Sequence, residues 1–194
     1  MAPTQLPIQL TNFIGREHDL SSVERILSAT RLVTLIGVGG CGKTRLAIKV
    51  ANQISQTFPD GVWFADLASL REPSLVPQFI LEALGVNLVA NQPLLVALKN
   101  HLRSKRLLLV LDNCEHLKEP CAELAQQLLS YAPELRILAT SREPLVIAGE
   151  AIYPVTGLDW PKFDREDVQA WQNNPNILEI MKFDAVHLFV EPLL

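Results

Sequence analysis

The sequence of 194 residues lacks the features that mark several large classes of protein. No apolar run approaches the roughly 18 residues of a membrane-spanning helix, and the richest run, residues 107–111, has only the length of a buried strand. The first ten residues hold no basic stretch and no long apolar stretch, so we expect no secretory signal. Lysine and arginine number 17 against 21 acidic residues, which argues against direct nucleic-acid binding, because phosphate contacts need clustered positive charge.

Cysteine is also scarce. Cys41, Cys114 and Cys121 form an odd, scattered set, which is typical of a reduced cytoplasmic protein and not of a disulfide scaffold. Cys114, Glu115, His116 and Cys121 are close in sequence, but their spacing matches none of the usual zinc patterns. We therefore expect a cytoplasmic protein without a zinc site at these residues.

What the sequence does contain is a regular alternation of short apolar segments and amphipathic segments. Hydrophobic residues make up 48% of the chain and charged residues 20%, which suits one domain with a buried core. The predicted strands are residues 31–36, 62–67, 106–111, 135–140 and 151–155. Apolar residues at helical spacing predict helices over residues 43–58, 73–84, 92–102 and 120–131. This alternation predicts a three-layer α/β fold, a mostly parallel five-stranded sheet with helices on both faces.

A glycine-rich motif follows the first predicted strand. Residues 37–44 read GVGGCGKT, a full match to the phosphate-binding pattern G-x-x-x-x-G-K-[ST]. Successive backbone N–H groups can wrap a polyphosphate only where Cβ atoms do not obstruct it, and the next helix points its positive N-terminal end at the same anion. Lys43 supplies a point charge to the β- and γ-phosphates, and the Thr44 hydroxyl can ligate Mg²⁺. The pattern predicts a nucleoside triphosphate site.

Two later strands end in residues that suit this site. Asp112 follows the apolar run of the third predicted strand, where a carboxylate can hold Mg²⁺ through water. Asn113 comes next. Because an amide cannot act as a base, we expect that hydrolysis is slow or that another group accepts the proton. Glu115 is the nearest carboxylate, although the simpler interpretation of Glu115 is a residue in the first turn of a helix, where its charge suits the helix dipole. Arg142 follows the fourth predicted strand and is either a γ-phosphate sensor or an ordinary surface arginine.

Taken together, these segments resemble the NB-ARC-like branch of the signal-transduction ATPases with numerous domains, the STAND class of P-loop NTPases. More narrowly, they resemble the ATPase module of large bacterial transcriptional regulators. The resemblance covers about residues 8–158 and rests on five segments in the family's order: FIGRE from Phe13, GVGGCGKT from Gly37, FPDGVWFADLA from Phe58, LLLVLDNCEHL from Leu107 and ILATSRE from Ile137.

The resemblance implies ATP or ADP with Mg²⁺ as ligands, with ADP holding an off state and ATP switching the protein on. It implies that Lys43, Asp112 and Arg142 are the catalytic residues and that Thr44 and Asp112 hold the metal. Ile14 and Arg16 are expected near the adenine. The full set of residues expected to contact the nucleotide is Ile14, Arg16, Gly37, Gly39, Gly40, Cys41, Gly42, Lys43, Thr44 and Arg45.

We expect residues 1–158 to form the P-loop nucleotide-binding domain and residues 159–194 a linker and the truncated start of a helical lid. The sequence has no counterpart of the proline motif of that lid or of the histidine of a winged helix. The expected function is an ATP/ADP-binding regulatory switch module of a signalling or transcription-regulating ATPase, with slow or no hydrolysis by itself and oligomerisation in the ATP state. The alternative is a stand-alone Mg²⁺-dependent ATPase.

Overall fold

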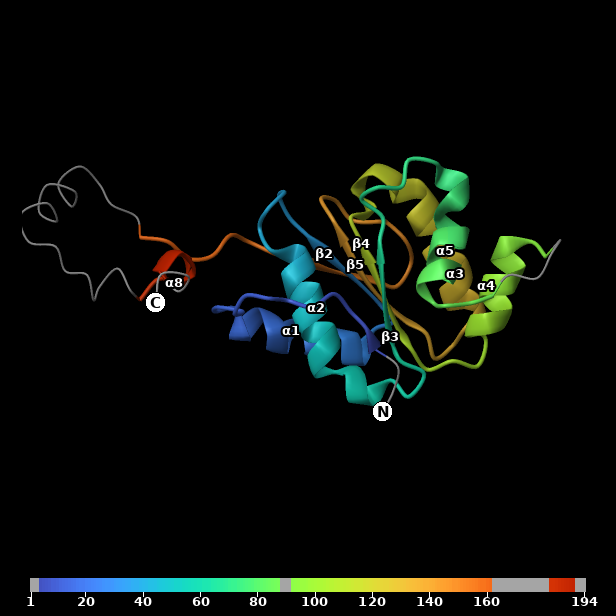
Figure 1. The fold of residues 1–194 in the computed structure, drawn as a ribbon, viewed down its shortest axis with the longest axis horizontal. Helices are drawn as coiled ribbons and strands as arrows, with labels where there is room; N and C mark the ends of the chain where they lie inside the picture. The colour runs from blue at the N-terminus through green and yellow to red at the C-terminus, as the bar shows by residue number, and fades with distance from the viewer. Residues whose placement is uncertain (1–3, 88–91, 162–181, 191–194) are drawn as a thin grey trace, which may run out of the picture.

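A computed structural model describes residues 4–87, 92–161 and 182–190. Its centre is a parallel sheet with helices on both sides (Figure 1). The strands are β1 (Thr4–Gln5), β2 (Leu32–Ile36), β3 (Val62–Asp66), β4 (Leu108–Asp112), β5 (Arg136–Ser141) and β6 (Glu150–Pro154). Their spatial order is β1-β3-β4-β5-β2-β6, and every neighbouring pair is parallel.

Among the described residues the sheet has six strands, one more than the five predicted. The additional strand, β1, pairs Thr4 with Val62 and Gln5 with Trp63 at the edge of the sheet. It is only two residues long, too short for an alternating or apolar pattern to show in the sequence. The three-layer parallel architecture itself is confirmed.

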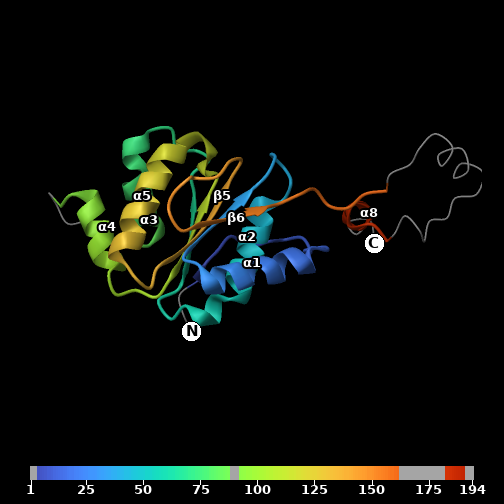
Figure 2. The ribbon, with the colours of Figure 1, turned by 180° about the vertical axis from the view of Figure 1, so that it is seen from behind.

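The described helices of the domain cover both faces of the sheet (Figures 1 and 2). On the first face lie α1 (Glu17–Ala29) and α2 (Lys43–Gln53), and on the second lie α3 (Val76–Ala83), α4 (Leu94–Leu102) and α5 (Lys118–Tyr131). The short helix α8 (Asp184–Val190) follows later in the chain. Single turns of 3₁₀ helix are η1 (Ser55–Thr57), η2 (Pro73–Leu75) and η3 (Cys114–Leu117).

The central strands are buried on both faces, which explains their unbroken apolar sequences. In β4, Leu108 and Val110 pack in the cluster with α1 and α2, whereas Leu109 and Leu111 pack in the cluster with α3, α4 and α5. Successive side chains of a strand point to opposite faces, so a strand between two helical layers needs apolar residues at every position. The sheet therefore separates two hydrophobic cores, one on each of its faces.

Several boundaries differ from the prediction. Helix α2 ends at Gln53 rather than residue 58, and η1 follows it. Helix α1 was not predicted, although its buried residues Leu20, Val23 and Leu27 keep helical spacing. Most of the expected linker, residues 162–181, lies outside the described residues.

The parallel arrangement brings the carboxyl ends of all the strands to one edge. The glycine-rich loop follows β2, Asn113 follows β4 and Arg142 follows β5, and these three strands are adjacent in the order β4-β5-β2. Ligand sites of open parallel sheets lie at this carboxyl edge.

Candidate nucleotide-binding site

The glycine-rich loop connects β2 to α2, and its shape depends on glycine. A Cβ atom on Gly37 would lie 2.5 Å from the carbonyl oxygen of Val155 and 2.9 Å from Sγ of Cys41, closer than real Cβ contacts come. Gly42, the residue before α2, has a φ of 91°, in the left-handed region that other residues rarely adopt. The loop therefore fits tightly against the chain that follows β6 and turns directly into the helix.

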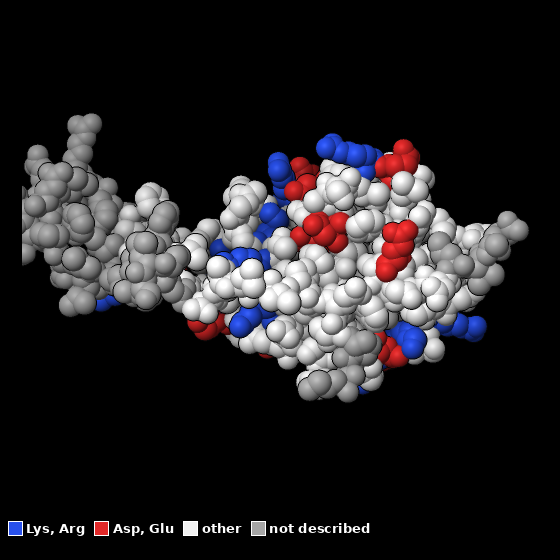
Figure 3. Space-filling view, in the orientation of Figure 1, with Lys and Arg blue, Asp and Glu red and all other residues white. Residues whose placement is uncertain are grey.

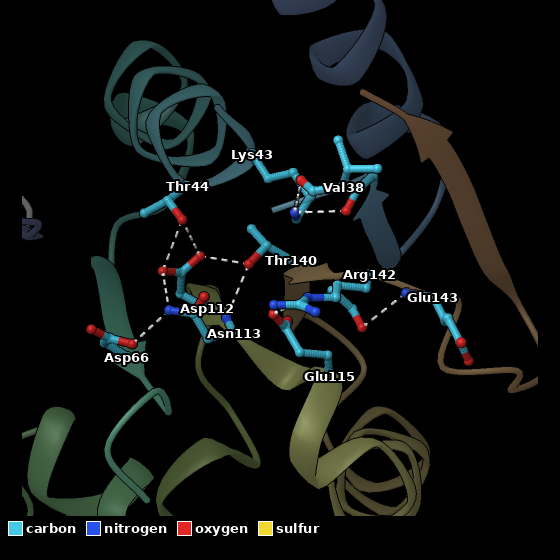
Figure 4. Close-up of polar contacts among 12 residues, drawn as sticks. Val38, Lys43, Thr44, Asp66, Asp112, Asn113, Glu115, Thr140, Arg142 and Glu143 are labelled. Carbon is cyan, nitrogen blue, oxygen red and sulfur yellow. Dashed lines mark hydrogen bonds and ion pairs between the residues drawn. The ribbon is translucent and has the colours of Figure 1, made fainter. Parts of the chain in front are cut away.

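Lys43 is buried at the start of α2, and its ammonium group is held by its own loop (Figure 4). Its Nζ donates hydrogen bonds to the carbonyl oxygens of Gly37, at 2.8 Å, and Val38, at 2.9 Å. The charge thus lies inside the curve of the loop, where it can contact an anion wrapped by the loop's backbone N–H groups.

The next residue, Thr44, links α2 to β4. Its hydroxyl donates to the two carboxylate oxygens of Asp112, at 2.8 and 3.0 Å (Figure 4). Asp112 also accepts a 2.5 Å hydrogen bond from the Thr140 hydroxyl and one from the Asn113 side chain at 2.9 Å. The predicted metal-binding pair, Thr44 and Asp112, is thus brought into direct contact by the fold.

Asp112 is almost fully buried, and this environment acts on its pKa in two directions. Burial raises the pKa of Asp112 above its ordinary value, because the carboxylate loses the solvation of water. The hydroxyls of Thr140 and Thr44 donate to the charged form and oppose that rise, while the charges of Asp66 and Glu115 add to it. A cation would relieve the repulsion among these acids.

Asn113 joins two strand ends instead of supplying a second acid. Its Nδ2 donates to Asp66 at 2.8 Å as well as to Asp112, and its backbone N–H donates to the Thr140 hydroxyl at 3.0 Å. Its φ of 61° lies in the left-handed region, which asparagine tolerates better than most residues. The amide therefore fixes the carboxylates and leaves this position without a base.

Arg142 lies immediately after β5, and its side chain extends to Glu115 (Figure 4). Its Nε forms an ion pair with Oε1 of Glu115 at 3.3 Å. One of its terminal nitrogens, Nη2, lies 3.8 Å from the place that a Cβ on Gly39 would occupy. The guanidinium thus borders the loop, although the side chain is 66% exposed.

On the other side of the loop lies a pocket of about 410 Å³. Six of the predicted nucleotide-contacting residues line it: Ile14, Arg16, Gly40, Cys41, Gly42 and Arg45. Its walls are completed by apolar side chains of Phe13, Leu158, Trp160, Ala185 and Leu188, from segments far apart in sequence. A mostly apolar pocket next to a phosphate loop suits a flat heteroaromatic base.

Arg16 ties the pocket to the loop. Its Nη2 donates to the carbonyl oxygens of Cys41, at 2.7 Å, and Thr156, at 2.8 Å, and its Nη1 pairs with Asp19 at 3.0 Å. Asp19 in turn accepts a 2.6 Å hydrogen bond from the Tyr153 hydroxyl. The arginine therefore connects the start of α1, the loop and the chain that follows β6.

Arg45 is bonded to backbone carbonyl oxygens of the N-terminal segment instead of pointing a free guanidinium at a phosphate site. Its Nη2 donates to the carbonyl oxygens of Asn12, at 2.6 Å, and Thr11, at 3.2 Å. Gln9 donates to the backbone oxygen of Arg45 at 3.2 Å, so residues 9–12 are fastened along α2. Arg45 shapes the pocket by holding this segment.

The residues present fit a Mg²⁺-bound polyphosphate. Thr44 and Asp112 offer hard oxygen ligands, Lys43 offers a positive charge, and a Cβ on Gly37 would obstruct the loop. A zinc site has no such support: Cys114 and Cys121 are buried, and the pKa of the Cys114 thiol is raised by its hydrogen bond to Cys121 and by burial. Among residues 4–87, 92–161 and 182–190, no cluster of three His, Cys, Asp or Glu side chains could hold a metal ion.

Thr140, Asp66 and Trp160 are among the residues of the site that the sequence did not predict. Thr140 bonds Asp112 and Asn113 but looks in the sequence like an ordinary strand residue. Asp66 reaches the site because β3 pairs with β4, which places it opposite Asp112. Trp160, which is 62% exposed, reaches the pocket through the chain after β6.

The parallel sheet, the loop between β2 and α2 and the acid at the end of β4 define a P-loop NTPase domain. The chain belongs to the AAA domain family, whose model matches residues 25–150.

Curated relatives extend the match to regulators. The chain is 42% identical over 149 residues to an uncharacterized protein of Mycobacterium tuberculosis and 44% identical over 133 residues to a putative HTH-type transcriptional regulator of the same organism. It is 33% identical over 159 residues to the regulatory protein AfsR of Streptomyces griseus. These alignments cover 77%, 69% and 75% of this chain but 38%, 15% and 16% of the relatives. The predicted resemblance to the ATPase module of bacterial regulators is confirmed.

Solved structures share the fold at low identity. A STAND protein with a tetratricopeptide repeat sensor from Pyrococcus horikoshii superimposes with a TM-score of 0.53 at 17% identity, over 89% of this chain and 27% of that one. A structure of Drosophila ORC bound to DNA gives 0.55 at 15% identity, over 80% and 45% of the two chains.

Two surface properties complete the description. On the face shown in Figure 3, lysine and arginine side chains lie among acidic ones. None of the helices in the described parts of the chain is long and apolar enough to cross a membrane.

Proposed function

We propose that this chain is an ATP- and ADP-binding switch module of a regulatory ATPase, with slow hydrolysis by itself. The observation on which this rests is that one loop separates two complementary half-sites. Lys43, Thr44 and Asp112 lie on one side of it, and the apolar pocket against Arg16 lies on the other. A nucleotide has these two halves, a polyphosphate and a base, joined by a sugar.

The proposed division of labour follows from the contacts. Backbone N–H groups of the loop and the start of α2 hold the phosphates, and Lys43 neutralises their charge. Thr44 and Asp112 hold Mg²⁺, which when bound offsets negative charge on the β- and γ-phosphates. Arg142 lies where it can distinguish ATP from ADP, since only ATP has a γ-phosphate to engage it.

Slow hydrolysis is supported by Asn113. The amide takes the position next to Asp112, where a carboxylate would accept a proton from the attacking water, and it is fixed by Asp66 and Asp112. A site that binds ATP tightly and cleaves it slowly suits a switch whose state is set by the bound nucleotide.

The wider role is proposed from the relatives. Their names include a putative HTH-type transcriptional regulator and a regulatory protein, and this chain matches a small part of each. We propose that the module acts within a cytoplasmic regulator of that kind, in which ADP holds the off state and ATP favours an on state that oligomerises. Other segments would then contact the DNA.

Calorimetry with ADP and ATP in the presence of Mg²⁺ tests binding. We expect micromolar or tighter binding by the wild-type chain and at least a hundredfold loss in Lys43→Ala. Lys49→Ala is the matched control, because Lys49 lies further along the same helix and contacts the Phe13 ring instead of the loop. Absence of wild-type binding, or equal binding by Lys43→Ala, would refute the proposal.

A turnover assay separates the switch from the alternative, a stand-alone Mg²⁺-dependent ATPase. We expect turnover well below about one per second, the lower end of ordinary enzyme rates. Faster hydrolysis by the isolated chain would favour the alternative.

A further inference from the structure

Glu115 has an unusual environment at the carboxyl edge of the sheet. Its side chain is 25% exposed, and Oε1 pairs with Nε of Arg142 at 3.3 Å. The other oxygen, Oε2, is buried and accepts no hydrogen bond from any residue that the structure describes. A buried carboxylate oxygen without a donor is costly, so such an oxygen in a folded protein calls for an explanation.

The position of Glu115 gives it access to the phosphate site. It lines a recess of about 500 Å³ together with Asn113, Arg142 and His116. The Arg142 guanidinium lies between Glu115 and the loop, because its Nε contacts Glu115 and its Nη2 approaches Gly39. Figure 4 shows the pair beside Asp112 and Asn113. The charge of Glu115 is close enough to raise the pKa of Asp112.

Other carboxylates near the site have other partners. Asp112 accepts hydrogen bonds from Thr44, Thr140 and Asn113. Asp66 accepts from Asn113 and from the backbone N–H of Ala68. Glu143 is 72% exposed and pairs with Lys118. Glu115 alone of these four acids keeps a buried oxygen unpaired, as judged over the described residues.

We propose that Glu115 is the carboxylate that activates the attacking water and that Arg142 masks it until ATP is bound. This inference rests on the proposed function, since it needs a nucleotide in the site. The γ-phosphate competes with Glu115 for the guanidinium, which is exposed and held by one weak ion pair. When Arg142 turns to the phosphate, Glu115 is freed to contact water.

The step that follows is ordinary phosphate hydrolysis. The water oxygen attacks the γ-phosphorus, and the bond between that phosphorus and the β–γ bridging oxygen breaks. ADP keeps the bridging oxygen with its electron pair, Glu115 takes a proton from the water, and inorganic phosphate leaves. Hydrolysis thereby depends on the same arginine that detects ATP, because an arginine paired with Glu115 blocks the proton acceptor.

The first test is single-turnover hydrolysis of ATP with enzyme in excess, which detects slow cleavage. Glu115→Gln should lower the rate about a hundredfold or more, the usual effect of removing a general base. Glu119→Gln is the matched control, because Glu119 is an exposed acid one helical turn away, and its rate should equal that of the wild type. Glu115→Asp keeps the negative charge, but its carboxylate is one methylene group further from the water, so its hydrolysis rate should also fall.

The second test measures binding alone. In Glu115→Gln, Arg142 is released, so the affinity for a non-hydrolysable ATP analogue relative to ADP should rise roughly two- to fivefold, as expected from losing an exposed ion pair. Arg142→Ala should abolish the preference for the triphosphate. Adding Glu115→Gln to Arg142→Ala should change nothing further, because the two residues act as one unit.

The outcomes separate this inference from the proposed function. If the wild type binds neither nucleotide, the proposed function fails. If it binds both but Glu115→Gln and the wild type cleave ATP at the same rate, the role of Glu115 is overturned and the proposed function stands. A wild type that binds ATP but never cleaves it, or an unchanged affinity ratio in Glu115→Gln, also overturns the inference. Retained ADP binding by Glu115→Gln shows that the variant is folded.

Discussion

The hydroxyl of Thr44 contacts both carboxylate oxygens of Asp112, at 2.8 and 3.0 Å, although 68 residues separate them in the sequence. Parallel pairing brings this about, because the loop after β2 and the end of β4 reach the same edge of the sheet. The contact joins the two residues that the family resemblance implies as holders of the metal. A cation bound here would take over the oxygens that now bond each other.

Asp112→Asn should therefore weaken Mg²⁺-dependent binding of ADP more than Mg²⁺-free binding. The amide removes the charge that attracts the cation, and losses of this kind are typically ten- to a hundredfold in metal affinity. Calorimetric titrations with MgCl₂ and with EDTA give the comparison. Asp66→Asn is the control, since it removes the same charge from the neighbouring strand end and should have a smaller effect. Equal losses with and without Mg²⁺ would argue against the metal role.

Gly37→Ala should destabilise the protein even without nucleotide. The new methyl group would meet the Val155 carbonyl oxygen at 2.5 Å, and a backbone atom cannot rotate away, so the loop or the chain after β6 must shift. Overpacking of this kind costs about 1–3 kcal/mol.

Gly39→Ala provides the contrast within the same loop. Its methyl group would meet only Nη2 of Arg142, at 3.8 Å, and the backbone of Gly39 does not have a positive φ. Its free energy of unfolding should stay within about 0.5 kcal/mol of the wild type. Chemical denaturation of both variants without nucleotide checks the difference, and equal stabilities would contradict the steric argument.

A third prediction concerns the opposite end of the sheet and pH. Asp60 accepts hydrogen bonds from Nζ of Lys105 and from the backbone N–H of Arg106, each at 2.8 Å. The Lys105 ammonium group first, and then the Arg106 N–H, hold the pKa of Asp60 below its ordinary value of 3.8. The ionised carboxylate is therefore favoured in the folded state. Its contribution to stability is complete above about pH 4 and is lost as the pH falls through the lowered pKa.

Asp60→Asn should cost about 1 kcal/mol at pH 7, the size expected of a partly exposed pair with a backbone hydrogen bond. Denaturation curves at pH 7 and near pH 2 measure the difference from wild type, which should shrink at the lower pH as the wild-type carboxyl becomes protonated. Glu123→Gln, which changes an exposed acid on α5, should show no such dependence. A difference that stays constant with pH would exclude the ion pair as its source.

The sequence predicted the fold well where a local pattern of residues is compatible with only one kind of structure. The pattern in residues 37–44 predicted the loop between a strand and a helix, and the unbroken apolar run before Asp112 predicted a central strand. Local patterns of this kind depend on burial and backbone geometry within a few residues, which the sequence expresses directly.

Pairing between distant segments could not be predicted in the same way. Thr140 and Asp66 reach Asp112 only through the strand order, and no local signal distinguishes them from other polar residues at strand ends. Nor could the sequence indicate that Arg45 would hold residues 11–12. Such partners follow from topology, which sets distances between residues far apart in the chain.

The position of β6 has a mechanical consequence. This strand pairs with β2 (Figure 2), so the chain leaves it alongside the glycine-rich loop. The Val155 N–H donates to the carbonyl oxygen of Ile36 at 2.7 Å, and Arg16 bridges Thr156 to Cys41. Because these short contacts join the glycine-rich loop to the chain that follows β6, we expect a displacement of one to shift the other.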